Sequence, residues 1–353
     1  MKVDFLVDSL ISGGAERVLV LLANHFEEQG QDVTIITFND NEVWKPNETI
    51  KRVKLHDGQI KNQMVRSTVV LLKHYYKKSN RPDFLITSMT RTNLIGILVA
   101  KFYGIKVIAS EHINHVMKAD KIEKFTRNYI YRFADALTCL TGFDIDYYKK
   151  KKANVLVMPN PVTFKIFKEE HRNREKVILA VGALDRYDHK GFDNLIPLIA
   201  PVLKKHKDWK LKLVGGGDKG TKLLKGLTKS HNIEDQVIFV GFSSEVSKIM
   251  QNSEIYIMPS RFEGLPMVLL EAMSQGMACI AFDCISGPSD IITNNVNGVL
   301  VENQNLDLMA KELDQLIESS DKRLEYSKQG VESLDNFKIE KIYQKYLDIF
   351  EDL

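Results

Sequence analysis

The sequence predicts an α/β protein with two domains, each built on a doubly wound parallel sheet. Short apolar runs alternate with helical patterns through the first half of the chain, and this β-α-β rhythm is typical of a parallel sheet. The same rhythm restarts after the segment "VLVMPNPV", which ends at Val162. The chain has 353 residues, which is enough for two hydrophobic cores of ordinary size.

The first half contains four apolar runs of strand length and one clear helical pattern. The helix is predicted over "GAERVLVLLANHFEEQG" and ends at Gly30. Buried strands of a parallel sheet appear as short, nearly continuous apolar runs. The predicted strands are "KVDFLV" (2–7), "DVTIITF" (32–38), "FLITSM" (84–89) and "KVIASEH" (106–112).

Five further strands are predicted in the second half. They are "KVILAVGAL" (176–184), "WKLKLVGGG" (209–217), "QVIFVGF" (236–242), "EIYIMPS" (254–260) and "ACIAFD" (278–283). Pro159 and Pro161 interrupt the chain before this restart, which puts the domain boundary near 161–163. We therefore expect two Rossmann-like domains, 1–161 and 162–335, that face each other across a central cleft. The tail, 336–353, has a helical period. It could pack against the second domain or cross back to the first.

Composition excludes several classes of protein. With 44% hydrophobic and 27% charged residues, the chain is globular rather than disordered. Cys139, Cys279 and Cys284 have no metal-ligand spacing, and their odd number argues against a disulfide framework, so a reducing cytosol is the simplest compartment. Asp4 and Asp8 interrupt the first apolar segment, which is therefore no signal peptide. No run approaches the roughly 20 apolar residues of a membrane span.

The net charge of +3 hides an asymmetry, because residues 1–160 carry +7 and the remainder carries −4. A basic first half suggests an anionic partner. No nucleic-acid motif is present, so we do not expect nucleic acid to be that partner.

Tyrosines beside lysines in the first half suggest a second surface, an anionic membrane interface. The alternative is a pair of helix C-termini at which cations are favoured by the helix dipole. The residues concerned are Tyr75, Tyr76, Lys77, Lys78, Tyr147, Tyr148 and Lys149 to Lys152.

Ligands of doubly wound sheets bind at the carboxyl ends of the strands, so the loops there are the candidate sites. Gly13 and Gly14 follow the first strand and would let backbone N–H groups approach a ligand; the dinucleotide fingerprint is absent, and a tight turn is the alternative. "SEHINH" offers Glu111, His112 and His115. A histidine at a strand end is more often structural, and these three residues do not make a convincing metal site.

The second half carries cations in the corresponding place. Arg186 and Lys190 lie in a predicted loop between a strand and a helix, where they could hold a diphosphate or simply be solvated. "LVGGGD" could cradle phosphate or merely turn. "VGFSSEV" has Ser243 or Ser244 as a plausible N-cap, and the backbone around Phe242 could hydrogen-bond a planar base.

The stretch "SRFEGLPMVLLEAMSQG" places two glutamates eight residues apart around a Gly-Leu-Pro turn. Pro266 suits the first position of a helix and Gly276 the left-handed residue just past its end, which bounds a helix at about 266–275. Glu263 then lies in the loop before the helix and Glu271 inside it. Both could point toward a ligand at the helix N-terminus, which favours anions. The alternative is two solvated acids.

Taken in order, "SGGAER", "SEH", "MPNPV", "VGALDRYDHKGFDNLI", "VGGGD", "VGF" and "PSRFEGLPMVLLEAMSQG" resemble the retaining glycosyltransferases of family 4, which have the GT-B fold. The resemblance covers essentially the whole chain. It implies an N-terminal acceptor-binding domain and a C-terminal domain that binds a nucleotide sugar.

The resemblance also implies roles for single residues. Glu263 would contact hydroxyls of the donor sugar and Glu271 those of the ribose, while Lys190 and Arg186 would bind the diphosphate. Backbone N–H groups of Gly264, Leu265 and Met267 would meet sugar and phosphate oxygens. Gly13 and Gly14 would lie near the phosphate or the acceptor, His112 near the sugar, and the backbone at Phe242 near the base.

One position departs from the family pattern, which usually has an arginine where this chain has Ala183. We infer that Arg186 supplies the missing guanidinium. With two cations on the diphosphate no metal and no other cofactor is required, and the leaving phosphate would take the acceptor proton on the front face of the sugar.

The resemblance favours bacterial enzymes that assemble capsule, O-antigen or N-glycan precursors. UDP is the expected nucleotide, a glycan or lipid-diphosphate-linked saccharide the expected acceptor, and the cytoplasm, with peripheral attachment to the inner face of the membrane, the expected location. Two alternatives remain open at this point: a GT-B epimerase of sugar nucleotides, and a non-catalytic partner that only binds them. A dehydrogenase is less favoured than either.

Overall fold

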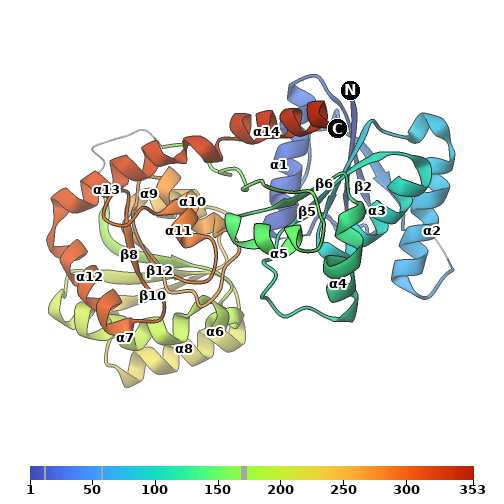
Figure 1. Cartoon of the computed structure of the whole chain (residues 1–353). Coiled ribbons are helices and arrows are strands. Elements are labelled where there is room, and N and C mark those ends of the chain that lie inside the picture. Colours follow the sequence, from blue (N-terminus) through green and yellow to red (C-terminus); the bar gives the residue numbers. More distant parts are fainter. Residues whose placement is uncertain (12, 57–58, 168–172) are drawn as a thin grey trace. The chain divides into compact units, whose positions relative to one another are not determined.

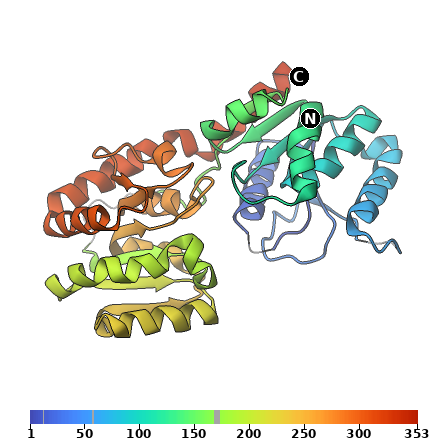
Figure 2. The same cartoon turned by 60° about the horizontal axis from the view of Figure 1, so that its bottom comes forward.

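The computed structural model of the chain describes residues 1–11, 13–56, 59–167 and 173–353 (Figure 1). The chain forms two compact units. Unit 1 contains Met1–Pro161 together with Phe337–Leu353, and unit 2 contains Val162–Asn336. Each unit is built on one parallel sheet with helices on both faces (Figure 2).

Unit 1 has a seven-stranded sheet in the order β3-β2-β1-β4-β5-β6-β7. Every pair of neighbouring strands is parallel, and the order reverses beside β1. The strands are β1 (Lys2–Val7), β2 (Asp32–Thr37), β3 (Lys51–Lys54), β4 (Phe84–Ser88), β5 (Lys106–Glu111), β6 (Ala136–Cys139) and β7 (Val155–Val157). The sequence patterns missed β3, β6 and β7, because "KRVK" has no apolar run and the other two strands are only four and three residues long.

The helices of unit 1 cover both faces of this sheet. They are α1 (Gly14–Glu28), α2 (Gln63–Tyr76), α3 (Thr90–Tyr103), α4 (Lys121–Phe125), α5 (Ile145–Lys149) and α14 (Ile339–Asp352). A π-helical turn, η2 (Thr126–Ile130), and a 3-10 turn, η3 (Tyr131–Phe133), continue the helical path of α4. Apolar side chains of α2, α3 and the sheet, such as Leu71, Ile97 and Leu85, form one buried core.

Unit 2 has a six-stranded parallel sheet in the order β10-β9-β8-β11-β12-β13. Its strands are β8 (Glu175–Val181), β9 (Lys210–Val214), β10 (Val237–Gly241), β11 (Ser253–Met258), β12 (Ala278–Asp283) and β13 (Val299–Glu302). β13 was not predicted from the sequence. Since the strands are parallel, the loops after β8, β9, β10 and β11 all leave the same edge of the sheet.

Helices also cover both faces of the second sheet. They are α6 (Tyr187–Lys190), α7 (Phe192–Lys205), α8 (Asp218–Ser230), α9 (Val246–Asn252), α10 (Met267–Ser274), α11 (Pro288–Ile291), α12 (Leu306–Glu318) and α13 (Ser320–Glu332). The core of the unit includes Phe192, Trp209 and Phe282, which are all buried.

The C-terminal helix α14 packs on unit 1, beside α1. The ring of Phe350 stacks on Phe84 with centroids 4.1 Å apart, and Phe26 meets Tyr343, Tyr346 and Phe350 edge to face. Aromatic pairs of this kind add to the stability that burial provides.

Three local predictions need correction. Pro266 is the N-cap of α10 rather than its first residue, although Gly276 has the expected left-handed φ of +68°. The N-cap of α9 is Glu245 rather than Ser243 or Ser244; the Oγ of Ser243 instead accepts a hydrogen bond from the Glu245 N–H. The segment of Arg186 and Lys190, predicted as a loop, contains a 3-10 turn, η5 (Leu184–Arg186), and α6.

Two of the tyrosines that the sequence suggests for a membrane surface are not exposed. Tyr75 and Tyr148 are fully buried, and the Tyr75 hydroxyl donates to Asp4 Oδ2 at 2.9 Å. These two rings therefore belong to the core of unit 1 and are not available to a membrane. In the described part of the chain, none of the helices has the length and apolarity needed to cross a bilayer.

Candidate functional site

The loops at the carboxyl edge of the unit 2 sheet pack backbone against backbone, and glycines make this possible. A Cβ added at Gly191 would overlap the carbonyl oxygen of Pro259, and one added at Gly215 would overlap that of Gly182. The Leu184 N–H also donates to the Gly216 carbonyl at 2.7 Å. Glycines of "LVGGGD" are therefore used to bring the loops after β8 and β9 together.

Two residues singled out from the sequence meet in this cluster of loops. Lys190, at the end of α6, donates from Nζ to Oε1 of Glu263 at 2.8 Å, and both side chains are largely buried. A charge-assisted hydrogen bond between largely buried groups is stronger than one at the surface. The cation expected to hold a diphosphate and the acid expected to hold a sugar thus neutralise each other.

A second ion pair fixes this arrangement. Arg261 donates to both carboxylate oxygens of Asp193, at 2.7 and 3.0 Å, and its backbone N–H donates to the His189 carbonyl at 3.0 Å. These bonds tie the loop after β11 to α6 and α7, and so hold Glu263 against Lys190. Sequence reasoning missed Arg261 and Asp193, because they lie 68 positions apart and only the fold brings them together.

The turn before α10 is held from another side. The Oγ of Ser286 donates to the Gly264 carbonyl at 3.0 Å, and Gly287 packs closely on the same carbonyl. Leu265 is buried, while Met267 opens the helix. The backbone that was predicted to meet sugar and phosphate oxygens is therefore in a fixed conformation at a helix N-terminus.

Glu271 lies in the second turn of α10 and is buried. Its Oε1 accepts a short hydrogen bond from the Oγ1 of Thr163. This bond from Thr163 orients the carboxylate of Glu271. Thr163 was not identified from the sequence.

The remaining predicted residues of unit 2 lie at the surface. Arg186 is exposed at the end of η5, and Phe242 is exposed in the loop after β10. Arg186 acts electrostatically on the segment that also carries Lys190. The pKa of His189 is lowered first by burial and then by the charge of Arg186. Three basic side chains therefore gather on residues 186–190.

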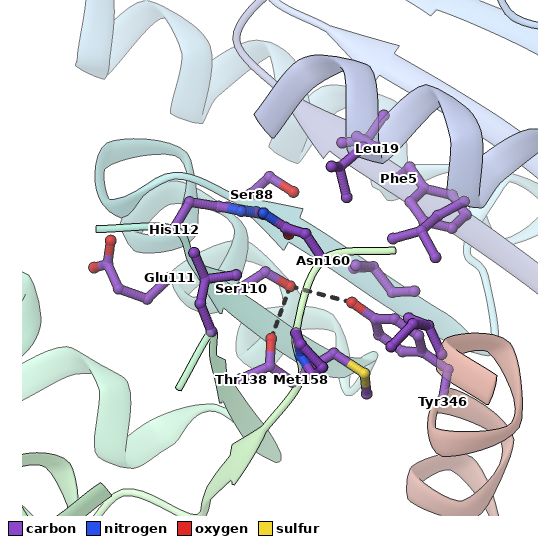
Figure 3. Close-up of a pocket in the computed structure, with 16 residues that line it drawn as sticks. Phe5, Leu19, Ser88, Ser110, Glu111, His112, Thr138, Met158, Asn160 and Tyr346 are labelled. Atoms are coloured by element: carbon purple, nitrogen blue, oxygen red, sulfur yellow. Dashed lines mark hydrogen bonds between the residues drawn. The ribbon is translucent and has the colours of Figure 1, made fainter. Parts of the chain in front are cut away.

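His112 lies in unit 1, in the loop after β5 (Figure 3). Both ring nitrogens are buried and, among the described residues, have no hydrogen-bond partner. Burial lowers the pKa of His112 to about 4, so the ring is neutral at pH 7. It borders a cavity of about 20 Å³ together with Ser88, Ser110 and Asn160, which has room for about one water molecule.

Glu111 and His115, the neighbours of His112, have structural partners. Glu111 is buried and accepts from Tyr131 at 2.6 Å and from Arg127 at 3.3 Å, and burial raises its pKa. The Nδ1 of His115 is 2.7 Å from Asp144 Oδ1.

Gly13 and Gly14 open helix α1. Gly13 is its N-cap, and the carboxylate of Glu16 folds back over it, where the helix dipole favours a negative charge. Burial and then the nearby Asp8 raise the pKa of Glu16. Gly14 faces open space. An anionic ligand at this helix end would meet Glu16, whereas a hydroxyl could donate to it.

Among the described residues, one group has side-chain atoms close enough together to bind a metal ion. It consists of His206, Asp314 and Glu318 in unit 2. The ammonium of Lys205, however, lies 2.7 Å from both carboxylates, and a cation already occupies the position between them. This group is separate from Lys190 and Glu263.

Comparison with known proteins gives two family matches that together span most of the chain. Residues 162–333 match the family described as glycosyl transferases group 1, and residues 12–165 match glycosyltransferase family 4. The chain is 29% identical to an amylovoran biosynthesis glycosyltransferase of Erwinia amylovora, covering 99% of each chain.

A second relative, from Campylobacter jejuni, is 28% identical over 100% of this chain and 99% of its own. Its name describes an N-acetyl-D-galactosaminyltransferase whose acceptor is a saccharide on undecaprenol diphosphate. Among solved structures, the Anabaena protein HepE in complex with UDP superposes with a TM-score of 0.82 and 18% identity, covering 100% of both chains.

Proposed function

The chain belongs to glycosyltransferase family 4 and has the GT-B fold, and from this premise we propose that it transfers a hexosyl group from a UDP-sugar with retention of configuration. The observation that carries the proposal is the Lys190–Glu263 pair, which holds a cation and a hydrogen-bond acceptor beside the N-terminus of α10. Lys190 can bind the diphosphate of a nucleotide sugar, and Glu263 can accept hydrogen bonds from the hydroxyls of its sugar.

A diphosphate carries more negative charge than a single carboxylate, so it competes with Glu263 for Lys190. Once Lys190 turns to the diphosphate, Glu263 becomes an acceptor for two sugar hydroxyls. The exchange couples donor binding to the orientation of Glu263. Arg261 does not take part, because Asp193 already engages it on both nitrogens.

The remaining residues are assigned to the ribose, the base and the sugar of the donor. Glu271, oriented by Thr163, accepts from the ribose hydroxyls. The backbone at Phe242 meets the base, and Gly264, Leu265 and Met267 offer N–H groups at the start of α10. The resemblance to the family assigns His112 to the sugar. Its ring is neutral and buried beside a cavity with room for about one water molecule, so this contact requires a bridging water molecule or a movement of the loop after β5.

Catalysis then consists of stabilising the charge that develops on the departing diphosphate. Lys190 and Arg186 are both cations of one short segment, η5 and α6, and Lys190 binds Glu263 in the loop before α10. Preorganised charges of this kind stabilise a transition state without reorganisation. We propose that they act without a metal ion, and that the leaving phosphate accepts the acceptor proton.

A pocket of about 420 Å³ in unit 1 suits the acceptor. It lies at the carboxyl ends of β1 and β4, and its lining combines polar side chains such as Asp8, Glu16 and Gln63 with Arg91 and with apolar side chains. Met89, at its edge, has a φ of +77°, a strained conformation of a kind that gathers at binding sites. Carboxylates accept hydrogen bonds from hydroxyls, so the pocket favours the neutral saccharide end of an acceptor.

The relatives suggest what carries that saccharide. One is named for amylovoran biosynthesis and one for an acceptor linked to undecaprenol diphosphate. We propose a lipid-diphosphate-linked or glycan acceptor at the cytoplasmic face of the membrane, in the assembly of a bacterial surface polysaccharide.

The deciding experiment is a panel of nucleotide sugars screened by thermal shift, since a ligand that binds only the folded state raises its stability. The stabilising donor is then incubated with saccharide acceptors, and NMR determines the anomeric configuration of the product. Transfer with retention is the expected result. Isomerisation of the donor without an acceptor would identify an epimerase, and donor binding without any turnover a non-catalytic partner.

A further inference from the structure

Three hydroxyl side chains lie at the same level of the unit 1 sheet. Ser110 of β5 pairs in register with Ser88 of β4 and with Thr138 of β6, and residues at one register level of a parallel sheet point to the same face. The Oγ1 of Thr138 donates to the Oγ of Ser110 at 3.0 Å (Figure 3). A polar row therefore crosses this face near the carboxyl ends of three strands.

The C-terminal helix α14 adds a fourth hydroxyl to this row. The OH of Tyr346 lies 3.5 Å from the Oγ of Ser110, and the Tyr346 side chain is buried (Figure 3). Burial raises the pKa of Tyr346, so the hydroxyl keeps its proton at pH 7. Leu19 of α1 and Ile342 of α14 line the same cavity as the hydroxyls. The polar row thus faces a space that is otherwise largely apolar.

His112 borders this cavity from the end of β5. Its two ring nitrogens are buried and have no hydrogen-bond partner in the described part of the chain, and buried polar groups of this kind are commonly satisfied by ordered water. The cavity of about 20 Å³ also borders Ser88, Ser110 and Asn160. It therefore has both the volume and the polar partners that one buried water molecule requires.

The hydroxyl chain gives such a water molecule a defined orientation. Ser110 accepts the hydrogen of Thr138, and a serine oxygen has a second acceptor position for Tyr346. The hydrogen of Ser110 is then directed into the cavity, to a water molecule that donates in turn to His112. A neutral imidazole accepts on one nitrogen and carries its hydrogen on the other. The chain therefore selects the tautomer of His112.

We propose that the cavity binds one water molecule that joins the Tyr346–Ser110 hydroxyl chain to His112, and that Tyr346 is a positioning residue that fixes the tautomer of His112. The inference deepens the proposed function, and its effect on transfer rests on the assignment of His112 to the donor sugar. It gives α14 a role in the site of unit 1 besides its packing on Phe26. The second ring nitrogen of His112, with its hydrogen, is left for the sugar.

Nitrogen-15 NMR of the full chain with labelled histidine tests the tautomer, since the shift of each ring nitrogen depends on whether it carries a hydrogen. The signals of His112 are those missing in His112→Gln. At pH 7 we expect one tautomer in the wild type and a mixture in Tyr346→Phe, which loses only a hydroxyl. Tyr343→Phe is the matched control. It removes a hydroxyl of the same helix that binds Gln31, and it should leave the tautomer unchanged.

Transfer kinetics with the donor found by thermal shift test the consequence. Tyr346→Phe should lower kcat/KM for that donor by roughly three- to tenfold, as is typical for the loss of one hydrogen bond. The affinity for free UDP, which has no sugar, should stay unchanged. In the His112→Gln background the same substitution should have no further effect, because the two residues act through one chain. Thr138→Val should resemble Tyr346→Phe, while Thr138→Ser keeps the hydroxyl and should retain wild-type activity.

Any of four results overturns the proposal. The wild type shows both tautomers, Tyr346→Phe shows the same single tautomer as the wild type, the losses of activity in Tyr346→Phe and His112→Gln are additive, or a high-resolution crystal structure of the full chain has no water molecule within hydrogen-bond distance of His112. Failure of the proposed sugar contact has a different signature. His112→Gln then leaves transfer unchanged, while the NMR comparison of Tyr346→Phe with Tyr343→Phe still decides the role of Tyr346.

Discussion

Lys190 and Glu263 satisfy each other in the unliganded chain at 2.8 Å, and this pairing determines how substitutions at each should behave. Removing Lys190 leaves a carboxylate that repels a diphosphate. Removing Glu263 leaves a cation that is fully available to one. The two halves of a single ion pair therefore have opposite effects on the binding of a nucleotide.

We expect Lys190→Ala to lower kcat by about 10²–10³, because one preorganised donor to a developing charge is worth about 2.7–4 kcal/mol. KM for the donor should rise less. Arg186→Ala should have a similar effect if Arg186 replaces the arginine missing at Ala183. Steady-state kinetics of both single variants and the double variant measure this. A change in kcat below about threefold for Arg186→Ala would leave Lys190 as the only cation on the diphosphate.

Glu271→Ala should weaken the binding of free UDP by roughly 10–100-fold, since hydrogen bonds to a charged group are worth about 1.5–3 kcal/mol. Glu263→Ala should leave UDP affinity unchanged or slightly increase it, while it damages transfer. Isothermal titration calorimetry with UDP compares the two, and Glu318→Ala on α12 serves as a control. An equal loss of UDP affinity in both variants would contradict the assigned roles.

His112 should make stability depend on pH. Its pKa is lowered by burial from 6.5 to about 4, so between these values the unfolded chain binds a proton that the folded chain does not. Stability is therefore complete above pH 6.5 and falls as the pH drops toward 4, by about 2 kcal/mol between pH 7.5 and 5.0. Urea unfolding of His112→Gln should show a pH dependence smaller by that amount.

The wild-type chain, unfolded in urea at the same pH values, is the reference for this measurement. If His112→Gln loses stability with falling pH as steeply as the wild type does, the ring of His112 is protonated in the folded chain at pH 5.

At the scale of elements, the candidate site depends on how closely the loops of unit 2 pack. Gly191 separates α6 from α7 and has a φ of +70°. Lys190, the residue before Gly191, lies next to Glu263, which belongs to the loop after β11. The bonds from Arg261 to Asp193 and His189 hold the same two loops from the other side, so the position of Lys190 is determined by packing at the strand ends.

We expect Gly191→Ala to destabilise the protein by at least about 2 kcal/mol, because alanine is strained at positive φ and its Cβ would overlap the Pro259 backbone. UDP affinity should fall as well. Gly226→Ala is the matched control, since Gly226 lies inside α8 with open space around it and should gain about 0.5–1 kcal/mol. Equal effects of the two substitutions on thermal unfolding would show that the loops tolerate a Cβ.

At the scale of the whole molecule, the chain returns to unit 1 through α14. This helix brings Tyr343, Tyr346 and Phe350 against Phe26 of α1. Unit 1 therefore depends on residues that follow all of unit 2 in the sequence. A protein shortened at its C-terminus would expose this aromatic cluster.

Phe350→Ala should lower the free energy of unfolding by about 3 kcal/mol, as is typical for loss of a buried phenylalanine. UDP affinity should stay unchanged, because Glu271 and Lys190 belong to unit 2. Urea unfolding and calorimetry measure the two quantities, with Leu324→Ala as a control that changes stability by less than about 0.5 kcal/mol. Loss of UDP binding in folded Phe350→Ala would show that the two units do not act separately.

The parallel class of both sheets and the positions of their long strands and helices follow from local patterns in the sequence. Long apolar strands and the helix bounded by Pro266 and Gly276 depend on contiguous residues, and local patterns of this kind are visible in one dimension. The short strands β3, β6, β7 and β13 were missed, because pairing with a neighbouring strand, rather than their own composition, makes them strands. The spacing of Glu263 and Glu271 was visible for the same local reason as α10.

The partners of the candidate site residues become visible in the fold alone. Glu263 meets Lys190 across 73 positions, Arg261 meets Asp193 across 68, and Glu271 meets Thr163 across 108. The fold also decides that Tyr75 is buried while Phe125, Tyr129 and Phe133 are exposed. Burial and pairing depend on which distant segments pack together, and residue type alone does not contain that information.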